Sequence, residues 1–159
     1  MTTKHVVADD VLGTITRRLW EVLRRVMEGT LNPDAVATAL QKIAEGTLPT
    51  EMTIAGRTYE IVDFLQKEDK GSVVGHTMVE RAKELNANLG EDDAQYLLDH
   101  QEEIPEALRG KVVFVFPGWR GPDDPGCVAY VYWRGDRWVR YWRWLDGDFY
   151  GYYRLLRRK

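Results

Sequence analysis

The sequence predicts an α+β fold in which helices come first and an antiparallel sheet comes last. Apolar residues recur at helical spacing in residues 11–28, whereas residues 111–156 are rich in aromatic and β-branched side chains. Tight-turn sequences such as Arg134-Gly135-Asp136 interrupt this second region. We therefore expect an N-terminal helical pair, a short hairpin, a second helical pair and a C-terminal antiparallel meander of about four strands. The meander is either open or curled into a small barrel.

Composition places broad limits on the protein. A chain of 159 residues with 44% hydrophobic content can bury a core without disulfides, and a single cysteine suits a reducing compartment. No run of residues approaches the roughly 18 apolar residues of a membrane span, and the N-terminus lacks a signal-peptide pattern. We therefore expect a cytoplasmic protein that does not associate with membranes.

The formal net charge of −3 is unevenly distributed. Residues 1–108 carry 20 acidic and 11 basic side chains, whereas residues 109–159 carry 5 acidic and 11 basic ones. The two halves thus have net charges of −9 and +6. The basic half either neutralises the acidic half within the fold or faces an anionic partner.

Two amphipathic helices are expected at the N-terminus. The apolar stripe of the first helix consists of Leu12, Ile15, Leu19, Val22 and Val26. Asp9 or Asp10 can cap its start, and Asn32-Pro33 has the composition of an N-cap followed by a first helical residue. Gly46 ends the second helix, so we predict a helical hairpin over residues 1–48 and an α+β domain over residues 49–159.

The middle of the chain is expected to contain a hairpin and two more helices. Residues 53–61 read as two short strands that turn at Ala55-Gly56. Residues 62–70 form a connector, after which Ser72 can cap a third helix that runs to about Asn86. The acidic residues 91–93 begin a fourth helix.

Several segments from residue 71 onward carry a resemblance to other sequences. They are residues 72–77 (SVVGHT), 81–90 (RAKELNANLG), 100–105 (HQEEIP), 108–114 (LRGKVVF), 119–120 (WR), 124–126 (DPG), 128–130 (VAY), 143–145 (RWL) and 154–159 (RLLRRK). Over about residues 71–159 the chain resembles a group of small uncharacterised proteins predicted in genomes of uncultivated bacteria. The resemblance implies a shared fold and brings no activity, cofactor or site residue with it.

Residues suited to catalysis or metal binding are few. His5, His76, His100 and Cys127 do not stand at the spacings typical of metal ligands. The three carboxylates at residues 91–93 are explained by a favourable interaction with the helix dipole. We therefore expect no catalytic residue, no cofactor and no metal, and a metal-dependent or Cys/His enzyme is the least favoured function.

The predicted sheet offers a candidate binding surface. Strict alternation over residues 137–145 places Trp138, Arg140, Trp142 and Trp144 on one face. The long loop over residues 117–126 adds Trp119 and Arg120 at its expected tip. Exposed aromatic and arginine side chains favour binding, although arginine stems can also lie over tryptophan rings as intramolecular cover.

These patterns favour a non-enzymatic binding protein whose aromatic, arginine-rich sheet contacts an unknown protein partner. The first alternative is a single-stranded nucleic-acid-binding protein, because arginine, tryptophan and tyrosine suit stacking on bases. The acidic net charge weighs against that alternative.

Overall fold

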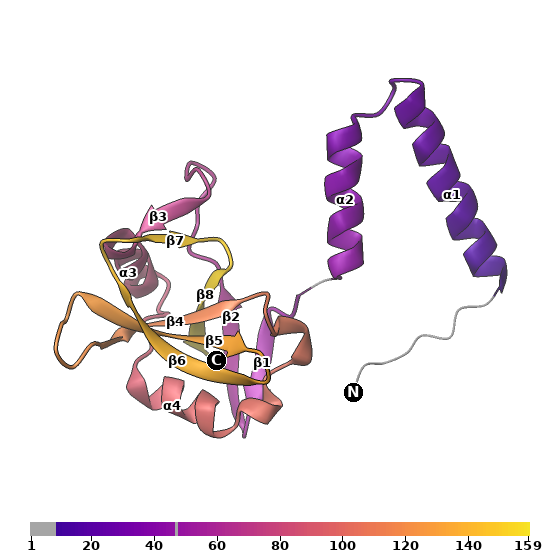
Figure 1. Ribbon diagram of the computed structural model, residues 1–159. Coiled ribbons are helices and arrows are strands. Elements are labelled where there is room, and N and C mark those ends of the chain that lie inside the picture. Colours follow the sequence, from indigo (N-terminus) through magenta and orange to yellow (C-terminus); the bar gives the residue numbers. More distant parts are fainter. Residues whose placement is uncertain (1–8, 47) are drawn as a thin grey trace. The chain divides into compact units, whose positions relative to one another are not determined.

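The computed structural model describes residues 9–46 and 48–159, and it divides the chain into two units, Met1–Thr47 and Leu48–Lys159. Both units are drawn in Figure 1. Among the described residues, no helix has the length and apolar character needed to cross a membrane.

The N-terminal unit is a helical hairpin made of α1 (Asp9–Met27) and α2 (Pro33–Glu45). Asn32 caps α2 as predicted, because its side-chain oxygen accepts hydrogen bonds from the amides of Asp34 and Ala35 at 2.9 and 3.2 Å. Asp9 and Asp10 lie within the first turn of α1 rather than before it, where their charges favour the helix dipole.

The C-terminal unit begins with the predicted hairpin, β1 (Glu51–Ile54) and β2 (Arg57–Val62). Its two-residue turn has positive φ angles at Ala55 and Gly56, which matches the right-handed twist of the strands. After the hairpin come the elements β3 (Ser72–Val74), α3 (Gly75–Glu84), α4 (Glu91–Asp99), η1 (Gln101–Glu103) and η2 (Glu106–Leu108).

Ser72 was expected to cap α3, but it lies in strand β3, and the helix starts three residues later. The helix starts at Gly75 because the backbone there packs closely against Leu145. A Cβ atom at Gly75 would lie 2.6 Å from the Leu145 carbonyl oxygen. The Gly75 amide donates to the carbonyl of Gly147 at 3.0 Å, so a distant turn satisfies the start of this helix.

The last five strands are β4 (Val113–Arg120), β5 (Cys127–Arg134), β6 (Arg137–Trp144), β7 (Asp148–Tyr150) and β8 (Tyr153–Arg158). β4, β5 and β6 form the expected antiparallel meander, and β5 and β6 turn at Gly135-Asp136. The expected continuation of the meander is wrong, because β7 leaves to pair with β3.

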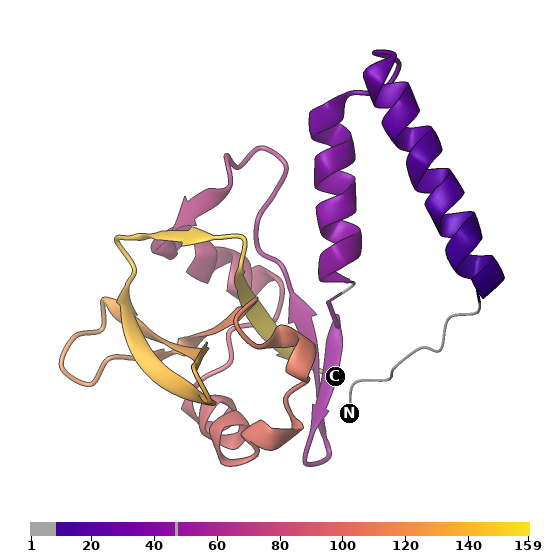
Figure 2. The same ribbon diagram turned by 45° about the vertical axis from the view of Figure 1, so that its right-hand side comes forward.

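The main sheet therefore has six strands in the order β1-β2-β8-β4-β5-β6, and it is not closed into a barrel. β8 fills the gap between the two hairpins, antiparallel to β2 and parallel to β4. Figures 1 and 2 show the sheet bending strongly around the unit, with α4 and α3 near different parts of it.

Both faces of the sheet are covered by apolar clusters. Phe114 and Phe116 of β4 belong to one cluster with Leu97 of α4, whereas Val115 between them belongs to a second cluster with Met78 of α3. Alternate residues of a strand point to opposite faces, so the two clusters lie on opposite sides. Neither face is wholly free to meet a partner, which limits an exposed binding surface to the margins of the sheet.

Candidate binding surface at the edge strand β6

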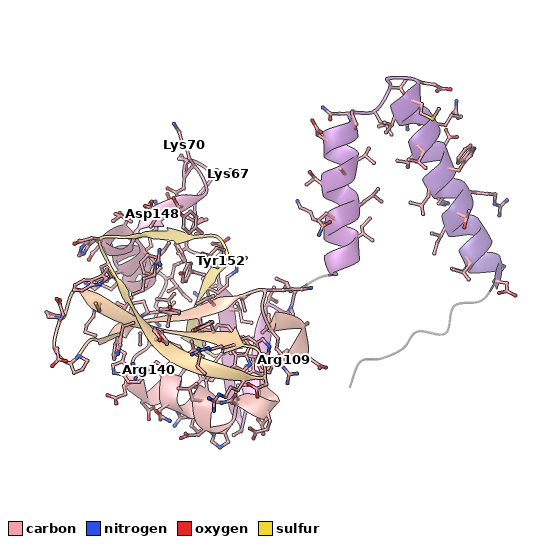
Figure 3. The ribbon with its side chains drawn as sticks, in the orientation of Figure 1. Lys67, Lys70, Arg109, Arg140, Asp148 and Tyr152 are labelled. Atoms are coloured by element: carbon pink, nitrogen blue, oxygen red, sulfur yellow. The ribbon has the colours of Figure 1, made fainter. Side chains whose placement is uncertain are left out.

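Three of the predicted binding residues gather beside β6. The rings of Trp119 and Trp142 meet edge to face with 5.4 Å between their centroids. The guanidinium carbon of Arg140 lies 4.7 Å from the centroid of Trp142 and 5.2 Å from that of Trp119. We call these three residues the indole–guanidinium cluster; Figure 3 marks Arg140 on β6.

A bulge in β4 positions Trp119. The pairing of β4 with β5 shifts register between Phe116 and Arg120, so extra residues stand on β4. Gly118 occupies the bulge, where its amide donates to the Leu89 carbonyl at 2.9 Å. A Cβ atom at this position would lie 2.7 Å from the Asn88 carbonyl oxygen, so only glycine permits so close an approach.

Arg120 braces the β4–β5 connection. Its Nε and Nη1 donate to the carbonyls of Pro117 and Pro125, both at 3.0 Å. The Asp124 carboxylate accepts from the Gly126 amide at 2.7 Å and tightens the same loop. Trp119 and Arg120 thus lie at the end of strand β4. The sequence instead predicts them at the tip of a loop.

The other two tryptophans predicted on β6 have opposite environments. Trp138 is 2% exposed and packs against Phe114 and Trp133, with ring centroids 5.4 and 5.8 Å away. Trp144 is 56% exposed at the far end of the strand. The structure therefore places Trp138 in the core, whereas Trp144 remains available for contact.

The outer edge of β6 is partly closed by one side chain. Oε1 of Gln101 accepts from the Trp138 amide at 2.8 Å, and its Nε2 donates to the Trp138 carbonyl at 3.3 Å. These contacts show that the main-chain groups of Trp138 point away from β5. Main-chain groups two and four residues further, at Arg140 and Trp142, point the same way.

No strand within residues 48–159 pairs with that outer side of β6, which is an end strand of the sheet. Between the Gln101 contact and the turn that follows Trp144, the edge therefore presents unpaired donors and acceptors. A row of such groups is a template on which another extended chain can pair.

Charged groups on β6 differ from those on β8. Two of the three cations of β8 form ion pairs within the unit: Arg157 pairs with Glu60, and Arg158 pairs with Asp92 and Asp93, whereas Arg154 donates to the carbonyl of Tyr153. The three arginines of β6 form no ion pair with any described residue, and these are Arg137, Arg140 and Arg143.

The arginines of β6 are not equivalent, however. Arg143 donates to the Asp148 carbonyl at 2.6 Å, and its guanidinium lies over the rings of Phe149 and Tyr153. The Nη1 atom of Arg140 and the Nε atom of Arg143 are both shielded from solvent, and neither has a hydrogen-bond partner among the described residues. Arg140 differs from Arg143 because it donates no hydrogen bond to a described carbonyl, so the charge of its half-buried side chain is left to attract an anionic group.

A cluster of tyrosines on the opposite face was not included in the predicted site. Tyr130 lies 5.5 Å from Tyr132, 6.3 Å from Tyr141 and 6.3 Å from Tyr153, measured between ring centroids. Burial raises the pKa of Tyr153 to about 12 and also raises the pKa of Tyr130. Alternation in β5 and β6 predicts part of this cluster, but Tyr153 joins it only through the parallel pairing of β8.

The tyrosine cluster borders a pocket of about 370 Å³. The pocket is lined by Gly110, Lys111, Val112, Val113, Tyr132, Trp133 and Tyr152. It lies between the start of β4, the end of β5 and the turn before β8, and Figure 3 marks Tyr152 there.

The acidic residues at the start of α4 have structural partners. Asp93 is 6% exposed and accepts from the Tyr59 hydroxyl at 2.7 Å and from Arg158 Nε at 2.8 Å. Burial and the hydrogen bond to Asp93 raise the pKa of Tyr59 to about 12. This network joins α4 to β2 and β8.

The residues weighed for metal binding or nucleophilic chemistry are dispersed. The Nε2 atom of His76 lies 2.8 Å from an Asp146 oxygen at the surface, and Nδ1 of His100 lies 3.0 Å from the Tyr96 carbonyl oxygen. Burial raises the pKa of the Cys127 thiol, which disfavours the reactive thiolate. Within the described ranges, no three His, Cys, Asp or Glu side chains gather as metal ligands would. His5 lies outside the described residues.

No protein-family model, curated protein or solved structure matches this chain. The expected resemblance to small bacterial proteins therefore stays a prediction.

Proposed function

We propose that this chain is a non-enzymatic binding protein whose edge strand β6 pairs with an extended, acidic segment of a partner protein. The observation that carries the proposal is the open outer edge of β6 between the Gln101 contact and the turn after Trp144. In strand addition of this kind, main-chain hydrogen bonds supply affinity and side-chain contacts supply specificity.

An acidic partner is favoured by the charges on β6. The half-buried guanidinium of Arg140, which forms no ion pair with a described residue, would attract a carboxylate of the added strand. Arg157 and Arg158 of β8 are already paired with acidic residues, so the attraction comes from the arginines of β6, which form no ion pair with a described residue.

The aromatic residues would provide the side-chain contacts. Trp144 is exposed at one end of the open edge, and the indole–guanidinium cluster stands beside its middle. Tryptophan and arginine are the residues most often found at the energetic centres of protein interfaces. Trp119, Arg140, Trp142 and Trp144 would thus form the contact surface, with Arg120 holding its shape.

A single-stranded nucleic acid is the second candidate ligand. The observation that favours it is the exposed indole of Trp144 on the same strand as Arg140. A base could stack on the indole while the guanidinium binds a phosphate group. The net charge of −3 opposes either anionic ligand, so the peptide is favoured because only a peptide can pair with the open main-chain groups of β6.

Fluorescence anisotropy with three labelled probes would test the proposal. The probes are a decapeptide of alternating Glu and Val, the matching peptide of alternating Lys and Val, and a decamer of deoxythymidine. We expect the full chain to bind the acidic peptide and to leave the basic one unbound. Binding of the deoxythymidine probe alone would favour the second candidate instead, and binding of none would contradict both.

Two charge-reversal variants locate the surface. Arg140→Glu should weaken binding of the acidic peptide on the order of 30-fold or more. The reason is that a negative charge then stands where the arginine would have attracted a carboxylate of the peptide. Arg134→Glu, at the exposed end of β5, makes the same change of charge away from the open edge and should have a small effect. Equal effects of the two variants would indicate non-specific charge attraction.

A further inference from the structure

We infer that the pocket between β4 and β5 is a binding site for the adenine ring of a nucleoside or nucleotide. The pocket has a volume of about 370 Å³ and lies on the β4 side of β5, whereas the strand β6 lies on the other side. Its volume is near the lower end of the range for small-molecule sites, about 300–1,000 Å³. The pocket therefore suits one flat ring system.

The pocket exists because the pairing of β4 with β5 ends early. The paired register stops at Phe114 and Val131, although β5 continues beside β6. At the position where Val112 would face Trp133, the Val112 amide instead donates to the Leu108 carbonyl at 3.2 Å. The segment before β4 thus turns away from β5 and leaves the pocket between the two.

The main-chain N–H and C=O of Trp133 face this pocket. Trp133 lies opposite Trp138, whose main-chain groups point away from β5 towards Gln101. In an antiparallel ladder, two opposite residues either bond to each other or both direct their main-chain groups outward. Those of Trp133 therefore point towards β4, and within the described residues no main-chain hydrogen bond joins them to the segment before β4. The pocket thus presents a donor beside an acceptor.

Three aromatic side chains supply walls for a flat ligand. Tyr132, Trp133 and Tyr152 line the pocket. The indole of Trp133 is held in place by the guanidinium of Arg109, 4.4 Å from its centroid, and by the ring of Trp138, 5.8 Å away between centroids. Figure 3 labels Arg109 and Tyr152. Nucleobases stack favourably on aromatic side chains, because every base has a flat π face.

Adenine matches the polar groups of the pocket better than the other bases do. Its N1 atom accepts and its adjacent amino group donates, so this edge can pair with the N–H and C=O of Trp133. Cytosine and uracil add a carbonyl oxygen and guanine adds an amino group, for which Val112 and Val113 offer no side-chain partner. Lys111 also lines the pocket, and its positive charge is compatible with a phosphate on the ribose.

Isothermal titration calorimetry of the full chain would test the inference with neutral probes. We expect adenosine to bind with a dissociation constant on the order of 100 μM or lower, and ribose not to bind. N6,N6-dimethyladenosine lacks the amino donor and should bind on the order of tenfold more weakly, because the Trp133 carbonyl loses its partner. The matched control is 7-deazaadenosine, which keeps the pairing edge and should bind like adenosine.

Two tyrosine variants locate the site. Tyr152→Ala should weaken adenosine binding on the order of tenfold, because it removes one wall of the pocket. Tyr150→Ala should change binding little, since Tyr150 does not line the pocket. The two rings stack on each other at 5.9 Å between centroids and are 49% and 43% exposed, so both variants lose the same mutual contact.

An NMR titration provides a readout that needs no variant. Adenosine should shift the amide resonance of Trp133. A second titration with AMP separates the two sources of the ring: tighter binding of AMP than of adenosine would identify a nucleotide, and equal binding would identify a nucleoside.

Three outcomes overturn the inference. The first is adenosine that does not bind. The second is equal affinity for adenosine and its dimethyl analogue, which would show that the main-chain groups of Trp133 do not read the base. The third is bound adenosine that leaves the Trp133 amide resonance unchanged, which would place the ligand elsewhere on the chain.

Discussion

Arg120 and Arg143 donate hydrogen bonds to main-chain carbonyls of their own unit, whereas Nη1 of Arg140 has no such partner. These residues look alike in the sequence, since each accompanies aromatic neighbours on a strand. Their roles differ because the carbonyls of Pro117 and Asp148 come within reach only in the folded chain. Binding is therefore expected to depend on Arg140, and folding on the other two.

Gly118 is a residue at which backbone approach limits substitution. Gly118→Ala should lower the free energy of unfolding by about 1–3 kcal/mol, because its Cβ would lie 2.7 Å from the Asn88 carbonyl oxygen. Urea denaturation measures the change. Gly147→Ala is the matched control, since its nearest contact is 3.4 Å away. Equal losses in the two variants would contradict this account of the bulge.

Tyr59 should make stability depend on alkaline pH. The pKa of its hydroxyl is raised to about 12 in the folded chain, so the neutral form is favoured by folding. The contribution of Tyr59 to the free energy of unfolding is complete below about pH 10, the usual tyrosine pKa, and is lost as the pH rises towards 12. We expect a loss of roughly 2–3 kcal/mol over that range, measured by urea denaturation.

The control for this pH effect is the same titration in two variants. Tyr59→Phe should remove part of the alkaline loss, whereas Trp144→Phe, which changes an exposed ring without a titratable group, should leave the slope unchanged. An unchanged slope in Tyr59→Phe would assign the alkaline loss to other groups.

At the scale of elements, β6 is an edge strand closed at one end by a side chain. Gln101 from η1 supplies one donor and one acceptor to Trp138, as a neighbouring strand would at one position. The same segment leaves the main chain at Arg140 and Trp142 open. Edge strands are commonly protected along their length, so partial protection fits a strand that receives a partner.

Gln101→Ala tests this role of the side chain. Loss of both hydrogen bonds to the Trp138 main chain should lower the free energy of unfolding by about 1–3 kcal/mol. Hydrogen exchange at the Trp138 amide should accelerate as well. Gln95→Ala removes an exposed glutamine that contacts Asp99 on α4, and it should cost well under about 1 kcal/mol. A Trp138 amide that exchanges at the same rate in both variants would show that Gln101 does not protect the edge.

Local sequence chemistry predicted the elements whose partners are close in the chain. Asn32 at the start of α2, the turn at Ala55-Gly56 and the β5–β6 hairpin are confirmed. The position of β8 could not be predicted, because its pairing with β2 and β4 joins residues far apart in the sequence. The strand β3 was missed for the same reason, since its partner is β7.

At the scale of the whole chain, the candidate site was predicted only in part. Alternation correctly placed Trp138 and Trp142 on one face, but it could not tell that Trp138 is buried in the core cluster and that Trp142 is only partly buried against it. The uneven charge was visible in the sequence. Only the fold separates Arg157 and Arg158 of β8, which pair with acidic residues, from the arginines of β6, which form no ion pair with a described residue.

Hydrogen exchange of the β6 amides, followed by NMR with and without the alternating Glu-Val peptide, tests strand addition most directly. The amides of Arg140 and Trp142 point outward, whereas those of Val139 and Tyr141 face β5. We expect the peptide to slow exchange of the outward amides at least on the order of tenfold and to leave the inward ones unchanged. A peptide that binds without slowing Arg140 and Trp142, or that does not bind, would contradict the proposed role of β6.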